Sequence, residues 1–179
     1  MLLKKALKRR AVWCLSFLLA LSLAGPVLSG KVYGATGANE YGGPIYPLLS
    51  MNKLDHLLQT DGKGKVVIIT FFASWCPPCR KEIPQLVHLR DKVSEDDMLI
   101  IGVSADESLP DLNKFLDRVE INFPVYLGMD DVFKEFEVTA IPVMVLYNSD
   151  GTVYQVVEGL LNEAMFNSMV NHLLGKAYE

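Results

Sequence analysis

The chain has 179 residues, of which 50% are hydrophobic and 21% are charged, and its formal net charge is −4. We expect one soluble domain preceded by an N-terminal targeting segment. Without residues 1–29 the remainder carries 12 basic and 21 acidic side chains. Such an acidic domain is a poor candidate for binding nucleic acid or anionic lipid surfaces.

Residues 1–30 have the pattern of an export signal. The first ten residues include five basic and no acidic side chains, and residues 11–30 carry no charge. The small residues Ser22 and Ala24 have the spacing of a cleavage site and favour a cleaved signal peptide, whereas the length of the uncharged run suits an uncleaved membrane anchor. Both interpretations remain open. In either case the remainder is expected to be periplasmic or otherwise extracytoplasmic, soluble after cleavage or anchored to the inner membrane.

The residues after this segment predict a flexible tether and then a folded domain. Residues 31–43 contain four glycines and form the expected tether, so the domain is predicted to span 44–179. Residues 44–51 predict a short edge strand, and Asn52 is the predicted N-cap of a short helix. Residues 66–72 are uncharged and rich in β-branched and aromatic types, which predicts a strand buried on both faces.

Next comes Trp75-Cys76-Pro77-Pro78-Cys79-Arg80, at the point where this strand gives way to an amphipathic helix reaching about residue 93, with Pro84 expected to kink it. The partial positive charge of a helix N-terminus favours a thiolate. Cys76 is therefore the predicted nucleophile, and Cys79 is the thiol that resolves the mixed disulfide. Pro77 and Pro78 lack the N–H groups that would stabilise the Cys76 thiolate, so we expect the pair to act as a reductant.

Later elements alternate between strands and helices. We expect a strand at 98–104, a helix from Ser108 or Asp111, a strand at 123–127, a helix at 130–136, a hairpin of 142–147 and 152–158, and a helix at 162–174. This order predicts an α/β domain with a central mixed β-sheet flanked by helices.

Two other interpretations of the cysteine pair, a zinc site and a structural disulfide, are weaker than a redox-active pair. A zinc site needs about four ligands, but there is no second cysteine pair, and His56, His88 and His172 show no paired spacing. A structural disulfide that closes so short a loop would add little stability. Cys76 and Cys79 are the only cysteines beyond the export segment, which fits a pair kept for redox work.

Two motifs carry a family resemblance. The segment 72–84, Phe-Ala-Ser-Trp-Cys-Pro-Pro-Cys-Arg-Lys-Glu-Ile-Pro, resembles the active-site segment of thioredoxin-fold proteins, and more narrowly of TlpA/ResA-like thiol–disulfide oxidoreductases. Thr139-Ala140-Ile141-Pro142 resembles the family's cis-proline loop, which faces the cysteines. The likeness runs from about residue 44 to about residue 174 and implies a thioredoxin fold.

The resemblance also implies roles for individual residues. A cis Pro142 would let the Ile141 backbone pair with an extended substrate segment beside Cys76. Trp75 is expected either to form a rim for substrate docking or simply to pack. Recognition is expected around Trp75, Ile141 and the loops near Asp106 and Gly128.

The proton acceptor for Cys79 stays open at this point. Thr70 stands where thioredoxins carry a buried aspartate, and a threonine cannot act as a base at neutral pH. Glu82 matches an acid in the family's motif, but it also reads as a solvated helix residue favoured by the helix dipole. Asp55 is a more speculative candidate, and water is another.

The leading hypothesis is an exported thiol–disulfide oxidoreductase that reduces extracytoplasmic proteins. The resemblance suggests apocytochrome c before haem attachment as one substrate. No nicotinamide or flavin motif is present, so we expect no cofactor beyond the cysteine pair, and a membrane-embedded electron donor. One alternative is a disulfide donor that uses the same cysteines. A Cu(I)-handling thiol module is another, although related copper chaperones have an extra residue between the cysteines and a distant histidine. A peroxidase is weaker still, because Ala73 stands where a threonine is expected.

Overall fold

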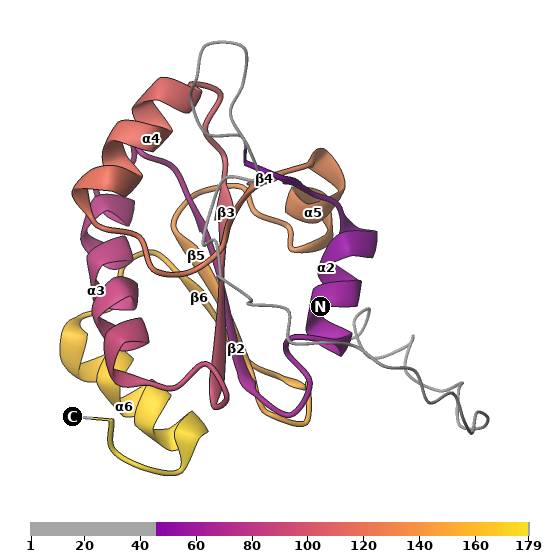
Figure 1. Cartoon of the computed structure of the whole chain (residues 1–179), viewed down its shortest axis with the longest axis vertical. Helices are drawn as coiled ribbons and strands as arrows, with labels where there is room; N and C mark the ends of the chain where they lie inside the picture. The colour runs from indigo at the N-terminus through magenta and orange to yellow at the C-terminus, as the bar shows by residue number, and fades with distance from the viewer. Residues whose placement is uncertain (1–45, 179) are drawn as a thin grey trace, which may run out of the picture. The chain divides into compact units, whose positions relative to one another are not determined.

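The described part of the computed structural model is residues 46–178. The predicted export segment at 1–30 and the tether at 31–43 lie outside the described residues. Figure 1 shows the elements in chain order: β1 (Leu48–Leu49), α2 (Met51–Gln59), β2 (Val66–Phe72), α3 (Cys79–Lys92), β3 (Met98–Ser104), α4 (Leu109–Arg118), β4 (Val125–Gly128), α5 (Asp130–Glu135), β5 (Val143–Tyr147), β6 (Val153–Glu158) and α6 (Glu163–Leu174). Within 46–178 no helix has the length and apolar character needed to span a bilayer.

The strands form one mixed sheet in the order β1-β4-β3-β2-β5-β6. The neighbours from β1 to β2 pair in parallel, whereas β5 pairs antiparallel with both β2 and β6. The predicted central mixed sheet is therefore confirmed. Because β2 and β3 are parallel neighbours, their carboxyl ends lie at the same edge of the sheet, with Phe72 opposite Ser104.

Helices cover both faces of the sheet. One buried cluster includes residues of α3, α4 and α6, and the other joins residues of α2 and α5, as Figure 1 shows. All seven residues of β2 are buried, as the sequence predicts for a strand with helices on both sides. Neighbouring side chains go to opposite faces, so Ile68 lies in the first cluster and Ile69 in the second.

Helix α3 begins at Cys79, so Cys76 precedes its first residue by three positions. The Cys76 carbonyl nevertheless accepts a hydrogen bond from the Arg80 N–H at 3.1 Å, which makes the chain from Cys76 onward continuous with the first turn. The helix passes through Pro84, and Val93 is its C-cap, which confirms the predicted end near residue 93.

Three boundary predictions are wrong. Within the described part of the expected edge strand at 44–51, only β1 (Leu48–Leu49) is a strand, because helix α2 already starts at Met51. Asn52 does not cap the first helix: Ser50 does, because its hydroxyl accepts from the Lys53 N–H at 3.4 Å and Asp131 accepts from the Met51 N–H at 2.9 Å. These two acceptors let α2 start at Met51. Strand β4 starts two residues later than predicted, because Pro124 has no N–H to give to a ladder.

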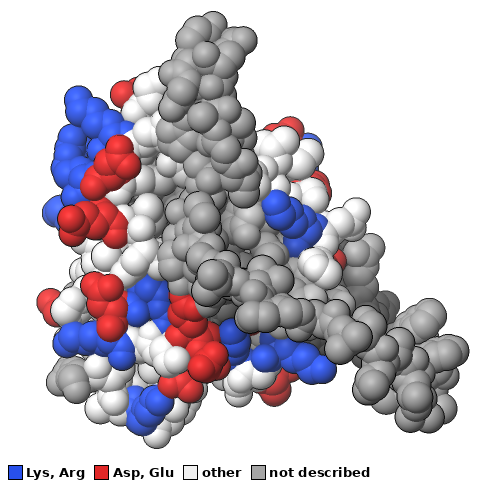
Figure 2. All heavy atoms as spheres, viewed as in Figure 1, with Lys and Arg blue, Asp and Glu red and all other residues white. Residues whose placement is uncertain are grey.

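The C-terminal hairpin and helix follow the prediction closely. A turn at 148–151 joins β5 and β6, with Gly151 at φ +80°, a conformation that suits glycine. Helix α6 is capped by Asn162, whose side-chain oxygen accepts from the Met165 N–H at 2.9 Å, and it ends at Gly175 in the left-handed conformation. On the face of the molecule shown in Figure 2, acidic and basic side chains are interspersed.

Candidate active site

The two predicted cysteines are joined to each other at the start of α3. Their sulfurs are 2.14 Å apart and their Cα atoms 5.3 Å apart, so they form a disulfide. This position follows from the local sequence. Strand β2 ends at Phe72, and the N–H of Cys76 donates to the Ala73 carbonyl at 3.2 Å, which turns the chain into the helix.

One backbone donor faces the first sulfur. The N–H of Cys79 lies 3.3 Å from Cys76 Sγ, whereas Pro77 and Pro78, between the two cysteines, have no N–H to offer. When the disulfide is reduced, this single donor and the start of α3 are what the helix end supplies to a Cys76 thiolate.

The proline loop lies beside the cysteines. The Ile141–Pro142 peptide bond is cis, as the family resemblance implies, and Cys76 Sγ is 3.7 Å from the Ile141 carbonyl oxygen. The sheet explains this proximity. Strand β5 starts at Val143 and runs antiparallel to β2, with Val143 opposite Phe71, so the loop before β5 reaches the end of β2 where the cysteine segment starts.

A largely apolar groove opens at the disulfide. Its volume is about 480 Å³, and it is lined by Trp75, Cys76, Pro77, Pro78, Ala105, Phe133, Val138, Thr139, Ala140 and Ile141. Trp75 is 65% exposed, which fits a rim residue and not the alternative of a packed one. Cys76 is only 3% exposed and Cys79 is fully buried. A second molecule would therefore reach the disulfide through the groove and not across an open surface.

Glu82 lies one helical turn after Cys79 and is 2% exposed, so the interpretation of a solvated helix residue is wrong. Residues three apart share a helix face, and helical side chains lean towards the N-terminus. Glu82 therefore lies on the same face of α3 as Cys79, and its side chain leans towards the end of the helix that carries Cys79. Burial raises the pKa of Glu82 from 4.5 to about 7, partly opposed by the Thr70 hydroxyl, which donates to Glu82 Oε1 at 2.6 Å.

Two other sequence candidates are placed less favourably. Asp55 lies in α2, which packs on the opposite face of the sheet from α3, so it does not join the cysteines. Recognition was expected at the loop near Asp106, and the Asp106 side chain itself is only 8% exposed. Its carboxylate instead accepts hydrogen bonds from Ser74 and Ser104. One signal could have indicated this contact, since carboxyl ends of parallel strands meet at one edge of a sheet.

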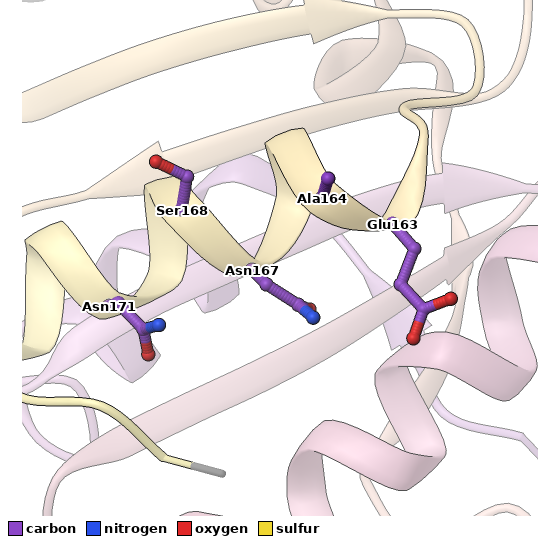
Figure 3. Close-up of a pocket in the computed structure, with 5 residues that line it drawn as sticks. All are labelled: Glu163, Ala164, Asn167, Ser168 and Asn171. Carbon is purple, nitrogen blue, oxygen red and sulfur yellow. The ribbon is translucent and has the colours of Figure 1, made fainter.

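A second hollow lies on α6, away from the cysteine groove. Figure 3 shows its lining, which is Glu163, Ala164, Asn167, Ser168 and Asn171. All five residues come from one helix. Tyr178 covers part of this face, since its hydroxyl donates to Asn167 and its N–H donates to the Asn171 side chain. The lining of this hollow contains no thiol or histidine.

A cysteine pair after a central strand, facing a cis-proline loop on a mixed sheet, defines the class of thioredoxin-fold proteins. Within this class, the chain belongs to the AhpC/TSA family, whose model matches residues 50–156. It is similar to the thiol-disulfide oxidoreductase ResA of Bacillus subtilis (strain 168), with 33% identity over 113 residues, which are 63% of each chain. The predicted ResA-like resemblance is thereby confirmed.

Solved structures agree on the fold. A thiol:disulfide interchange protein of the thioredoxin family from Chlorobium tepidum TLS matches with a TM-score of 0.59 and 28% identity, covering 81% of this chain and 98% of that one. A thiol-disulfide isomerase from Corynebacterium glutamicum matches with a TM-score of 0.60 and 23% identity, covering 66% and 86%. The matches with the first curated relatives span 58% to 63% of those relatives' lengths.

Proposed function

We propose that the protein is a thiol–disulfide oxidoreductase that uses Cys76 and Cys79 as its redox pair. The observation that carries this proposal is a disulfide whose Cys76 lines an apolar groove, with Cys76 Sγ 3.7 Å from the carbonyl oxygen of Ile141 in the cis-proline loop. The names of the relatives, thiol-disulfide oxidoreductase and thiol:disulfide interchange protein, support the same chemistry.

The reaction balances as a two-electron exchange. The Cys76 thiolate attacks one sulfur of a substrate disulfide, which forms a Cys76–substrate bond and releases one substrate thiolate. The Cys79 thiolate then attacks Cys76 Sγ and releases the second substrate thiolate. The substrate gains two electrons and two protons, and the protein is left with the Cys76–Cys79 disulfide seen in the structure.

Buried Cys79 must lose its proton before it can attack, and Glu82 is the acceptor that we assign to it. Glu82 follows Cys79 by one helical turn, and the pKa of its carboxyl, about 7, suits proton transfer near neutral pH. Thr70 does not act as a base here. Its hydroxyl donates a hydrogen bond to Glu82 Oε1 and thereby orients the Glu82 carboxyl.

Substrate binding is assigned to the groove. Trp75 forms its exposed rim, and the Ile141 backbone next to Pro142 offers hydrogen-bonding groups to an extended segment of the substrate. A disulfide-containing protein with apolar residues near its cysteine suits a groove whose lining is mainly apolar.

The direction of electron flow is proposed to be reduction of exported proteins. Pro77 and Pro78 have no N–H, so the N–H of Cys79 is the one backbone donor that residues 77–79 offer to Cys76 Sγ. This limits the stabilisation of the Cys76 thiolate and favours the disulfide form. Residues 1–30 support an extracytoplasmic location, soluble or membrane-anchored. There, a membrane-embedded donor would supply the electrons, and apocytochrome c is one fitting substrate.

The test is the equilibrium of the full chain with glutathione, together with reduction of a disulfide-containing protein such as insulin. A potential more negative than about −200 mV supports a reductant, whereas one near the −120 mV or so of the strong oxidant DsbA would show a disulfide donor. Pro77→Ala restores one N–H, and we expect it to lower the pKa of Cys76 and raise the potential. Tight one-to-one binding in a Cu(I) titration would favour the copper-handling alternative instead.

A further inference from the structure

A buried carboxylate sits beside the loop that carries Cys76. Asp106 Oδ2 accepts from the Ser74 N–H at 2.8 Å, and Asp106 Oδ1 accepts from the Ser74 hydroxyl at 2.5 Å. On the other side, the Ser104 hydroxyl donates to Asp106 Oδ2 at 2.8 Å and accepts from the Asp106 N–H at 3.0 Å. All three residues are buried, with exposed fractions of 6%, 2% and 8% for Ser74, Ser104 and Asp106.

These bonds tie two separate segments together. Ser104 is the last residue of β3, whereas Ser74 lies between the end of β2 and Cys76. The sheet does not depend on the carboxylate at this point, because the Ala105 N–H donates to the Phe72 carbonyl at 2.8 Å and continues the backbone pairing. Burying a carboxylate is costly, and here two of its three hydrogen bonds come from Ser74 in the cysteine loop.

The loop is short enough to transmit this attachment to the sulfur. Only Trp75 separates Ser74 from Cys76, and the turn is closed by the bond from the Cys76 N–H to the Ala73 carbonyl. Cys76 is then held from the β3 side through Ser74 and faces Ile141 on the β5 side. Loosening Ser74 would let Cys76 and the Trp75 rim move together.

We propose that Asp106 is a positioning residue for the dithiol, and that its carboxylate holds the Ser74–Cys76 loop so that Cys76 stays within bonding reach of Cys79 and beside Ile141. This assignment rests on the proposed function, since it gives Asp106 a part in the same exchange. Asp106 acts through Ser74 and takes no part in the electron transfer itself.

The expected consequence is a change in the effective concentration of one thiol at the other. In the reduced protein the loop is free of the covalent link, so the hydrogen bonds to Asp106 limit how far Cys76 strays from Cys79. Without these hydrogen bonds the Ser74–Cys76 loop gains more conformational freedom in the reduced protein than in the oxidised protein, where the disulfide still restrains it. The disulfide then forms less readily, and its equilibrium with a small dithiol moves towards the reduced protein.

The experiment measures the equilibrium constant of the full-length protein with dithiothreitol, at fixed pH, for the wild type and three variants. Asp106→Ala removes all side-chain bonds, and we expect it to shift the constant roughly tenfold towards the dithiol. Asp106→Asn keeps one acceptor oxygen and should give a smaller shift. Ser74→Ala removes only the hydroxyl bond, so it remains informative if Asp106→Ala fails to fold.

Asn122→Ala is the matched control for stability. Its side-chain amide donates to the Val87 carbonyl at 3.0 Å and to Asp91 at 2.8 Å in the second half of α3, so the variant also loses two hydrogen bonds. We expect a lower melting temperature and an unchanged redox equilibrium. A graded shift in the Asp106 and Ser74 variants alone supports the proposal.

The result that overturns the proposal is a set of constants within twofold of the wild type for Asp106→Asn, Asp106→Ala and Ser74→Ala, with a loss of stability like that of Asn122→Ala. The network would then be purely structural. Failure of the proposed function looks different. In that case the wild type would exchange with dithiothreitol but reduce no protein disulfide, while the ratios between variant and wild type would still decide the role of Asp106.

Discussion

Replacing Glu82 with glutamine should remove a pH-dependent loss of stability from the protein. Burial raises the pKa of this carboxyl from 4.5 to about 7 in the folded state. Between these two values the unfolded chain has released the Glu82 proton while the folded chain still holds it. The free energy of unfolding therefore falls as the pH rises through this range, and the loss is complete above about pH 7.

The size of the effect follows from the two pKa values. At about 1.4 kcal/mol per pH unit, the ionised Glu82 carboxylate costs the folded state about 3 kcal/mol at pH 8. Glutamine has no such penalty, and its oxygen still accepts the hydrogen bond from Thr70. Glu82→Gln should thus match the wild type near pH 4.5 and exceed its stability by up to about 3 kcal/mol at pH 8.

The assay is urea unfolding of the oxidised protein from pH 4.5 to pH 8, with Glu163→Gln as the control. Glu163 is exposed in the first turn of α6, where Figure 3 shows it, and its replacement should change stability by no more than about 0.5 kcal/mol at any pH. Parallel pH profiles for the wild type and Glu82→Gln would refute the assignment of a buried carboxyl with a raised pKa.

Three further substitutions test other parts of the structure. Thr70→Val removes the hydrogen bond that lowers the pKa of Glu82, so the midpoint of the pH-dependent stability loss should move to higher pH in the same urea titration. Gly128→Ala should destabilise the protein by about 1–3 kcal/mol, because the added Cβ would lie 2.5 Å from the Phe133 ring; a melting temperature equal to that of the wild type would contradict the packing described. Glu137→Gly should stabilise the protein by up to about 1 kcal/mol, because Glu137 adopts φ +51°, a conformation that costs a non-glycine residue energy. A lower stability of this variant in urea would show that the Glu137 side chain contributes more than its backbone conformation costs.

Most of the fold could be predicted from periodicity and turn residues. The uncharged run of β2 and the Asn148–Gly151 turn each have a local signature, and both were confirmed. Capping was harder, because the first turn of α2 draws one acceptor from Ser50 and the other from Asp131, 80 residues away from Met51 in the chain. A partner that is brought in by the tertiary fold leaves no local signal.

The same reasoning separates the site residues that were found from those that were missed. The cysteines and Pro142 stand in short motifs that carry their chemistry, so sequence alone could place them. The bond between Thr70 and Glu82 joins the middle of β2 to the first turn of α3 across 12 residues. Asp106 reaches Ser74 across 32 residues, and only the parallel pairing of β2 and β3 brings them together.

Trapping of mixed disulfides tests the central claim, that Cys76 is the nucleophile of a dithiol that exchanges with substrate disulfides. The measurement compares Cys79→Ala with Cys76→Ala after each reduced protein is incubated with a disulfide-containing protein and separated under non-reducing conditions. We predict a stable adduct on Cys76 in the Cys79→Ala variant and almost none in Cys76→Ala, because Cys79 is fully buried. Equal trapping by both variants, or adducts on Cys79 alone, would contradict the account.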